Sequence, residues 1–285
     1  MLSVTLLQTA LYWHDPVANR AALEESIFGL DQPTDLIVLP EMFTTGFTME
    51  ASAVAEHPRL TTHRWMHQMA AQTNAVVTGS YVVRENGHFY NRLLWMQPDG
   101  QFASYDKRHL FRMAGEDKVY TAGNERIVQE WRGWRICPLI CYDLRFPVWS
   151  RNQSVSSVAP DLSHNQFVSS IAPDLSQGQL MKQIDYDLLI YVANWPGARQ
   201  HAWDTLLQAR AIENLAYVAG LNRVGDDEKG HHYGGGSALL DYTGEVLFRH
   251  YETPVIHQQT LSLENLRAFR EQFPAHRDAD GFALL

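Results

Sequence analysis

The feature that most constrains the fold is an apolar run that ends abruptly at a cysteine, within the stretch WRICPLICYDLRFP at 134–147. Residues 136–140 have the length and β-branched content of a buried strand. The run stops at Cys141, because the polar and bulky residues after it do not continue such a strand. A cysteine at this break is held by a rigid element with its sulfur facing outward, which suits a nucleophile. The alternative is a small buried hydrophobic residue, which is what most free cysteines are.

One more buried-strand run and one strand-like segment end at charged residues. LIVLP at 36–40 is followed directly by Glu41, and SYDKRHL at 104–110 carries Lys107 after a strand-like segment. Each pattern predicts a charged side chain at the end of a strand. An ordinary surface position is the alternative for both residues.

The segments LPEMFTTGF, YDKRHLF and ICYDLRFP resemble, in this order and approximate spacing, the three signature segments of the nitrilase superfamily, the carbon–nitrogen hydrolases. Within it they are most similar to the omega-amidase branch, which removes ammonia from ω-amides of 2-oxo acids. The resemblance implies that Cys141 is the nucleophile, Glu41 the base and Lys107 its cationic partner. It also implies an α-β-β-α sandwich with two mixed β-sheets, which usually pairs with a second copy, so we expect a homodimer.

The order of elements along the chain favours a layered α/β fold. Helices alternate with strands, and several strand pairs lack a crossover helix, which is typical of mixed sheets. No linker divides the chain, so we expect a single domain over residues 1–285. The patterns predict helices at 16–28, 61–73, 202–214 and 262–271, strands at 2–7, 36–40, 75–83, 89–96, 127–131, 134–140, 187–193 and 217–221, and a hairpin of 237–240 with 246–248.

One segment departs from this pattern. Residues 152–184 contain a near repeat, VSSVAPDLS at 155–163 and VSSIAPDLS at 168–176. The family pattern passes almost directly from the helix after the cysteine to the DYDL strand, so we expect 152–184 to be an insertion on the surface. Its position close to Cys141 leaves three interpretations open: a passive loop, a cover over the pocket and a subunit contact.

The residue types at the three strand ends suit amide hydrolysis. A free thiol has a pKa near 8.5 and needs a base or a cation to become a nucleophile at neutral pH. Glu41 is placed to act as the base. Lys107 would stabilise the thiolate and then the tetrahedral oxygen, together with the backbone N–H of Tyr142. No HExxH or Cys/His zinc spacing is present, and the reaction needs no metal or organic cofactor.

Further site residues are suggested by position. Family enzymes carry a second glutamate after the lysine, and Glu116 is the candidate, with a solvated loop acid as the alternative. Arg145 and Arg112 are candidates for holding a substrate carboxylate, because a guanidinium matches two oxygens. Arg145 as a structural partner of Asp143 or Glu213 is the other interpretation. The expected pocket walls, for which core packing is the alternative, are Phe43, Tyr142, Trp195 and Trp203.

Charge and cysteine content restrict the partners and the compartment. The formal net charge of −9 gives no basic footprint for nucleic acid. The two cysteines are four residues apart, which argues against a disulfide framework. Residues 1–15 lack the basic region and cleavage site of a signal peptide, and no apolar run approaches about 20 residues, so no membrane partner is expected. We expect a cytoplasmic enzyme.

The resemblance implies an amidase that hydrolyses a small ω-amide of a 2-oxo dicarboxylic acid, such as 2-oxoglutaramate, through a cysteine thioester. A nitrile hydrolase or an N-carbamoyl amide hydrolase of the same superfamily is the alternative. A non-catalytic binding protein on this fold is a third possibility, which predicts a damaged set of Glu41, Lys107 and Cys141.

Overall fold

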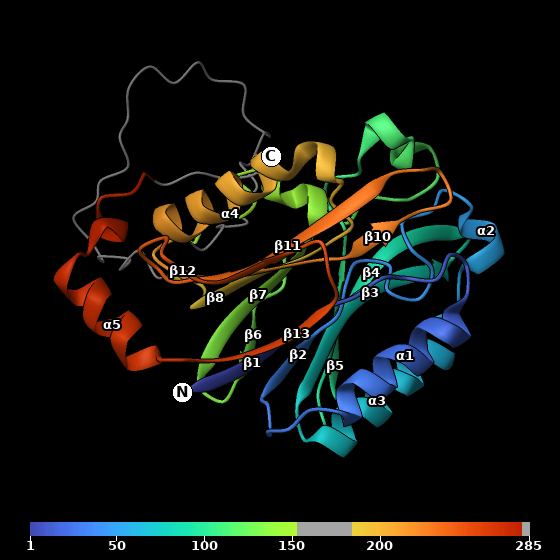
Figure 1. The fold of residues 1–285 in the computed structure, drawn as a ribbon. Coiled ribbons are helices and arrows are strands. Elements are labelled where there is room, and N and C mark those ends of the chain that lie inside the picture. The colour runs from blue at the N-terminus through green and yellow to red at the C-terminus, as the bar shows by residue number, and fades with distance from the viewer. Residues whose placement is uncertain (153–183, 281–285) are drawn as a thin grey trace, which may run out of the picture.

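The computed structural model describes residues 1–152 and 184–280, which form two stacked β-sheets with helices on their outer faces (Figure 1). The first sheet has six strands in the order β13-β1-β2-β3-β4-β5. Its centre, β1 to β3, is parallel and its outer pairs are antiparallel, so the sheet is mixed. The strands are β1 (Leu2–Gln8), β2 (Leu36–Val38), β3 (Val76–Glu85), β4 (His88–Met96), β5 (Phe102–Asp106) and β13 (Val255–Leu261).

The second sheet repeats this plan with strands from the later part of the chain. The order is β10-β11-β9-β8-β7-β6, and β12 pairs with β11. The centre, β7 to β9, is parallel, whereas β6, β10 and β12 are paired antiparallel. The strands are β6 (Gln129–Trp131), β7 (Trp134–Ile140), β8 (Leu188–Ala193), β9 (Tyr217–Asn222), β10 (Val224–Asp226), β11 (His232–Leu240) and β12 (Val246–Tyr251).

Helices cover the outer face of each sheet. Helices α1 (Pro16–Phe28) and α3 (Thr61–Thr73) lie together on the first sheet, and α4 (Gln200–Asn214) packs on β9 and β11 of the second (Figure 1). The side chain of Asp15 accepts hydrogen bonds from two backbone N–H groups of the first turn of α1, as its position before a proline predicts. A short helix, α2 (Ala51–Val54), and a late helix, α5 (Leu263–Gln272), complete the set in the described residues.

The core follows from the alternation of side chains along the strands. In β2, Leu36 and Val38 face the core between the two sheets, whereas Ile37 faces the layer under α1 and α3. In β3, Val76 and Val77 divide in the same way. Both faces of the central strands are therefore buried, which explains their nearly continuous apolar sequence.

The expected fold class is confirmed: the molecule is an α/β protein with two mixed sheets between helical layers. Helix α3 has the predicted bounds, and the predicted hairpin is the β11–β12 pair. Strands β10 and β13 and helix α2 were not predicted. Most of the predicted insertion at 152–184 lies outside the described residues.

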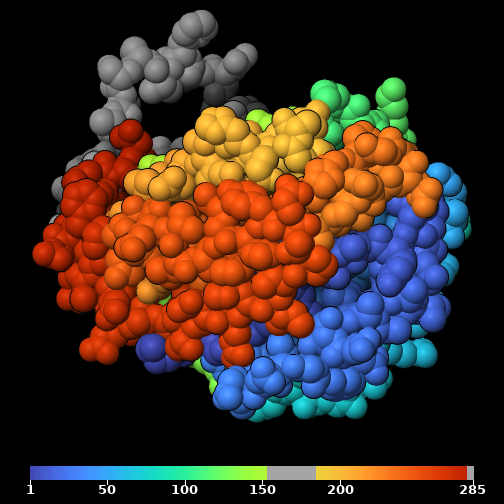
Figure 2. Space-filling model, viewed as in Figure 1, coloured from blue at the N-terminus to red at the C-terminus, as the bar shows by residue number. Residues whose placement is uncertain are grey.

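Strands β12 and β13, in orange to red, form much of the face in Figure 2, beside the blue N-terminal helices. Within the two described ranges, no helix has both the length and the apolar character needed to cross a bilayer.

Candidate active site

Cys141 is the first residue after β7 and begins a 3₁₀ turn, Cys141–Arg145. Its φ of +43° lies in the left-handed region, which is costly for a residue with a Cβ. Such strain is concentrated at functional sites, where it exposes a nucleophile at a strand end. The thiol of Cys141 lines a cavity, whereas that of Cys137, on the same strand, is completely buried; both are free.

The turn at Cys141 is held in place by the buried carboxylate of Asp143. Its Oδ2 accepts hydrogen bonds from the Tyr105 hydroxyl at 2.7 Å and the Ile140 N–H at 3.0 Å. Its Oδ1 accepts the backbone N–H of His109 at 3.1 Å and lies 2.8 Å from His109 Nδ1. One carboxylate thereby joins the cysteine turn to strand β5 and to the loop that follows it.

Glu41 lies just beyond β2 and is fully buried. Its Oε1 accepts hydrogen bonds from Lys107 Nζ at 2.9 Å and Asn91 Nδ2 at 2.8 Å. Its Oε2 accepts the backbone N–H of Asn194 at 2.8 Å, and the carboxylate acts to raise the pKa of the nearby Cys141 thiol. Donors from separate elements therefore fix the carboxylate next to the sulfur.

Lys107 follows β5 directly and is also buried. Its ammonium donates to both oxygens of Glu116, at 3.0 and 2.9 Å, as well as to Glu41. Glu116 opens the 3₁₀ turn Glu116–Lys118, is fully buried and accepts the Phe111 N–H at 2.6 Å. Glu116 is therefore not a solvated loop acid. The structure brings together all four residues predicted to be catalytic.

Burial and neighbouring charges set the protonation of this cluster. Burial raises the pKa of the Cys141 thiol well above its ordinary value; Glu41 adds to the rise and Lys107 opposes it. Burial also raises the pKa of Glu116, an effect that Lys107 opposes and Glu41 reinforces. Burial acts to lower the pKa of Lys107, but Glu116 and Glu41 outweigh it, so the pKa is raised and the amine stays protonated. The thiolate therefore has to form by local proton transfer.

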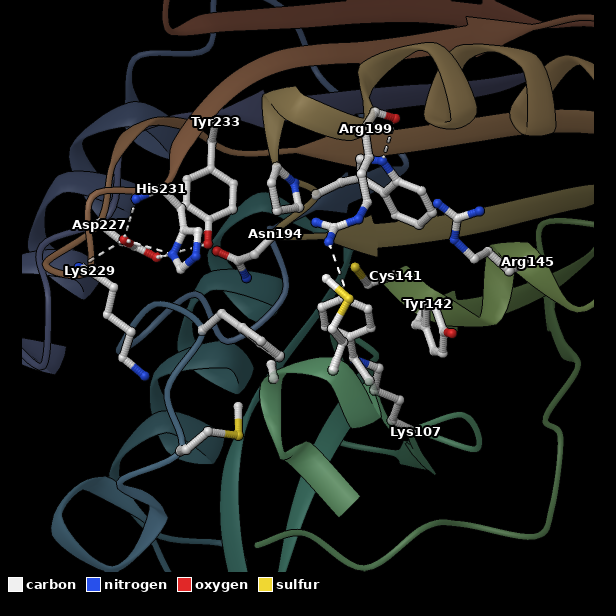
Figure 3. Close-up of a pocket in the computed structure, with 17 residues that line it drawn as sticks. Lys107, Cys141, Tyr142, Arg145, Asn194, Arg199, Asp227, Lys229, His231 and Tyr233 are labelled. Atoms are coloured by element: carbon white, nitrogen blue, oxygen red, sulfur yellow. Dashed lines mark hydrogen bonds and ion pairs between the residues drawn. The ribbon is translucent and has the colours of Figure 1, made fainter. Parts of the chain in front are cut away.

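A cavity of about 310 Å³ opens beside the sulfur (Figure 3). Lys107, Cys141 and Asn194 contribute polar atoms to its lining. Aromatic side chains form much of the rest, and Tyr142 packs against Phe111 with ring centroids 5.0 Å apart. The charged residues of the lining, besides Lys107, are Arg145, Arg199, Asp227 and Lys229.

The two predicted arginines have different surroundings. Arg145 lines the cavity, and its guanidinium lies 4.9 Å from the centroid of the Trp195 ring. It does not pair with Asp143, which binds Tyr105 and His109, or with Glu213, whose ion pairs are with Arg210 and Arg151. The side chain of Arg112 is 86% exposed, lies 3.9 Å from Asp117 and is not part of the lining. The prediction that Arg112 holds substrate does not fit this placement.

The predicted pocket walls also divide. Tyr142 and Trp195 line the cavity, as expected. Phe43 does not: it is fully buried in the layer under α3, with its ring centroid 5.7 Å from that of Trp65. Trp203 is likewise buried, behind Trp195 at 5.4 Å between ring centroids. For Phe43 and Trp203 the core-packing interpretation is the correct one.

Several polar residues at the site were not predicted from the sequence, among them Asn194, Asn91 and Arg199. Asn194 directly follows β8, so the strand-end argument applied to Glu41 also fits it. Asn91 interrupts the apolar part of β4, which signals a polar function on a buried face. Arg199 lines the cavity from the turn before α4, with its guanidinium 5.3 Å from the Phe111 ring centroid and 3.7 Å from the Met113 sulfur. Nothing in the sequence distinguishes Arg199 from a surface arginine.

No cluster of three or more His, Cys, Asp or Glu side chains that could hold a metal ion occurs in residues 1–152 and 184–280. The donors at the site are already committed to one another, since Glu41 and Glu116 share the Lys107 ammonium.

The sandwich and the strand-end cysteine define a class, the nitrilase superfamily, and the comparisons agree. The family model described as carbon–nitrogen hydrolase matches residues 3–155 and 180–271. The chain belongs to the carbon–nitrogen hydrolase family and is a hydrolase of carbon–nitrogen bonds. The resemblance found in the three sequence segments is thereby confirmed.

Relatives match over their whole length. Omega-amidase YafV of Yersinia enterocolitica is 48% identical over 285 residues, covering 100% of this chain and 99% of that one. Omega-amidase YafV of Escherichia coli (strain K12) is 46% identical over 290 residues, covering 99% of this chain and 98% of that one. The crystal structure of XC1258 from Xanthomonas campestris, described as a CN-hydrolase superfamily protein with an arsenic adduct in the active site, has a TM-score of 0.88 and 43% identity, covering 100% and 99%.

Proposed function

We propose that this protein is an ω-amidase that hydrolyses the terminal amide of a small 2-oxo dicarboxylic acid monoamide, such as 2-oxoglutaramate. The observation that carries the proposal is the meeting of Cys141, Glu41 and Lys107 beside a cavity that also holds arginines. Two of the relatives reported above are named omega-amidases, and a Bacillus subtilis relative, 28% identical over 279 residues, is named 2-oxoglutaramate amidase.

In the first half of the proposed reaction, Glu41 takes the proton of the Cys141 thiol and the sulfur attacks the amide carbon. The negative oxygen that forms is stabilised by the Lys107 ammonium and by the backbone N–H of Tyr142. The carbon–nitrogen bond then breaks, and the nitrogen leaves as ammonia with the proton that Glu41 received. A thioester on Cys141 remains. Burial raises the pKa of the thiol, so the proposed attack needs a base nearby, and we assign that role to the carboxylate of Glu41.

In the second half, Glu41 removes a proton from water, and the hydroxide attacks the thioester carbon. The carbon–sulfur bond breaks, and the sulfur regains a proton from Glu41 as the acid is released. The net change is amide plus water to acid plus ammonia, without a cofactor. Glu116 holds the Lys107 ammonium by two hydrogen bonds and so keeps it beside Glu41.

The carboxylate of the substrate is proposed to bind the guanidinium of Arg145, assisted by Arg199. Both side chains line the cavity, and neither has an ion pair among the described residues. Both residues also contact Trp195. The Arg145 guanidinium lies over the Trp195 ring, and the indole N–H of Trp195 donates a hydrogen bond to the backbone carbonyl of Arg199 at 2.9 Å. Tyr142 and Trp195 form walls that orient the chain of the substrate.

A substrate panel tests the proposal. Purified enzyme is expected to release ammonia from 2-oxoglutaramate with a kcat/KM at least about 100-fold higher than from glutamine, a nitrile or an N-carbamoyl amino acid. Faster turnover of the nitrile or the carbamoyl compound would refute the ω-amidase assignment. Cys141→Ala is expected to lower kcat by at least about 10³-fold. The matched variant Cys137→Ala, in a buried position outside the cavity, is expected to keep wild-type kcat.

We propose that the protein is a cytoplasmic homodimer of single-domain subunits. The family resemblance supports a homodimer, which light scattering of the purified protein tests, and the two free thiols suit the reducing cytoplasm. The family match in two blocks, with residues 156–179 between them unmatched, supports a single domain carrying an insertion near 152–184.

A further inference from the structure

Asn91 contacts every charged member of the buried cluster. It lies in the middle of β4, opposite Val82 of β3, and is fully buried. Its Nδ2 donates to Glu41 Oε1 at 2.8 Å and approaches Glu116 Oε1 at 3.4 Å. Its backbone carbonyl accepts the N–H of Lys107 at 3.0 Å. A single neutral residue therefore bridges the two carboxylates and anchors the backbone of the lysine between them.

The direction of the Asn91 amide is dictated by its neighbours. Carboxylates only accept hydrogen bonds, so the NH₂ group has to face Glu41 and Glu116 and the carbonyl has to face away. That carbonyl, Oδ1, is buried without a hydrogen-bond partner among the described residues. A buried amide with an unpaired oxygen is less favourable for folding than a leucine of similar size. The benefit of an asparagine at this position therefore lies in the carboxylates that it contacts.

The charge balance of the cluster explains what the amide contributes. Two carboxylates, Glu41 and Glu116, share one ammonium, that of Lys107. A second cation would weaken Glu41 as a proton acceptor, and an apolar residue would leave one oxygen with a single donor. An amide adds a hydrogen bond to the carboxylate without adding charge, which favours its ionised form.

We infer that Asn91 is a positioning residue that keeps Glu41 ionised and aimed at the Cys141 thiol. Asn91 acts through Glu41 and does not touch the substrate: it is absent from the cavity lining. The inference rests on the proposed role of Glu41 as the base, but not on which amide is the substrate. The other titratable groups that face Glu41 are Lys107, Glu116, Cys141, Tyr120 and Tyr233.

The pH profile of kcat/KM for Asn91→Leu tests the inference. Because Glu41 loses a donor to its ionised form, we expect the acid limb of the profile to move about one to two pH units upward. At pH values well below the wild-type limb this corresponds to a fall in kcat/KM of about ten- to 100-fold, with a smaller loss at pH values above the shifted limb. Asn91→Ser serves as the test if Asn91→Leu folds poorly. Its side chain is too short to reach Glu41 and adds no bulk, so we expect it to shift the acid limb in the same direction.

Asn19→Leu is the matched control. Asn19 is an equally buried amide, on α1, and within the described part of the chain its side chain bonds only to the backbone of Tyr12 and Thr44. It is expected to lower thermal stability without moving the acid limb. An unmoved limb in both Asn91 variants would overturn the inference. A wild-type profile without an acid limb would instead count against Glu41 as the base, so the two failures are distinguishable.

Discussion

Three arginines near the cysteine differ in what surrounds them, and these surroundings decide their proposed roles. Arg145 and Arg199 lie on the cavity wall, where a flat aromatic ring supports each guanidinium. Arg112 extends into solvent beside Asp117. A guanidinium that lies against an aromatic ring and has no carboxylate partner among the described residues is prepared to receive one from a ligand.

Substitution of these arginines should affect charged substrates selectively. Arg145→Gln is expected to raise KM for 2-oxoglutaramate about ten- to 100-fold with a smaller change in kcat, because it removes a charge-assisted contact to the carboxylate. Arg199→Gln is expected to act in the same direction. Steady-state kinetics on 2-oxoglutaramate and on an uncharged amide of equal length provide the measurement.

Arg112→Gln is the matched control and should leave both parameters unchanged. A variant at Arg145 that impairs the uncharged amide as strongly as the oxo acid would indicate a structural role in place of carboxylate binding.

Sequence alone could predict the residues that carry unusual chemistry. Cys141 and Glu41 each follow an apolar run and Lys107 follows a strand-like segment, so their position at a strand end was visible. The complete burial of Glu116 was not, because it depends on a turn that folds back against Lys107. Arg112 and Arg145 looked equivalent in the sequence, since only the three-dimensional path of the loop after β5 separates them.

At the scale of elements, the site depends on how strand ends are held. The turn at Cys141 has a left-handed residue and would not keep its shape alone. Asp143 compensates by accepting hydrogen bonds from β5, from the end of β7 and from the loop after Lys107. Cys141 and the Lys107 ammonium are therefore positioned by a shared support.

Asp143→Asn should disturb both sides of this support. The amide nitrogen would face hydroxyl and N–H donors, so we expect a loss of about 2–4 kcal/mol in the free energy of unfolding. We also expect kcat/KM to fall by about 100-fold, since small misplacements of reacting groups are costly. Urea denaturation and steady-state kinetics are the measurements.

Asp117→Asn is the control for Asp143→Asn. Asp117 is partly exposed, in the loop after β5, so this variant is expected to retain wild-type stability. Wild-type stability in Asp143→Asn would show that the turn does not need the carboxylate.

Elements with strong periodicity were predictable, and those defined by their neighbours were not. The apolar spacing of α3 and the unbroken run of β7 are local signals. Strand β13, VIHQQTL, is mostly polar and partly exposed, and exists because β1 offers it an edge to pair with. Strand β10 has only three residues and is defined as a strand by its pairing with β11. Tertiary pairing of this kind leaves little trace in the sequence.

At the scale of the whole molecule, the late helix α5 is attached to the second sheet by a buried charge cluster. Asp187 Oδ1 pairs with Arg270 of α5 at 2.6 Å and with Arg135 of β7 at 3.0 Å. Burial acts to raise the pKa of Asp187, but hydrogen bonds and charge from Arg135 and Arg270 outweigh it, so the pKa is lowered. The carboxylate therefore stays ionised and joins the two elements.

Asp187→Asn is expected to lower the free energy of unfolding by about 3–5 kcal/mol at pH 7, because it leaves a buried guanidinium unpaired. A lowered pKa in the folded state stabilises the protein above the ordinary pKa of about 3.9, and this contribution is lost as the pH falls through the folded-state value. The difference between wild type and variant should thus be constant from pH 7 to 5 and shrink below pH 4. Urea unfolding at pH 7, 5 and 3 measures it.

The exposed Asp31→Asn is the control and should stay within about 0.5 kcal/mol of wild type at each pH. A difference that grows on acidification would contradict the ionised pairing of Asp187.

The pairing of β1 with β13 joins residues 2–8 to residues 255–261, seven pairs between segments at opposite ends of this sequence. A ribosome adding about 5–20 residues per second takes roughly 13–50 s to travel from one segment to the other. During that interval the apolar first strand of the nascent chain has an unpaired side that can associate with other polypeptides. Recovery of soluble enzyme from cells should therefore depend on chaperone capacity and translation speed. A chain cut before residue 255 lacks β13, so the side of β1 that pairs with it should stay open to association with other polypeptides.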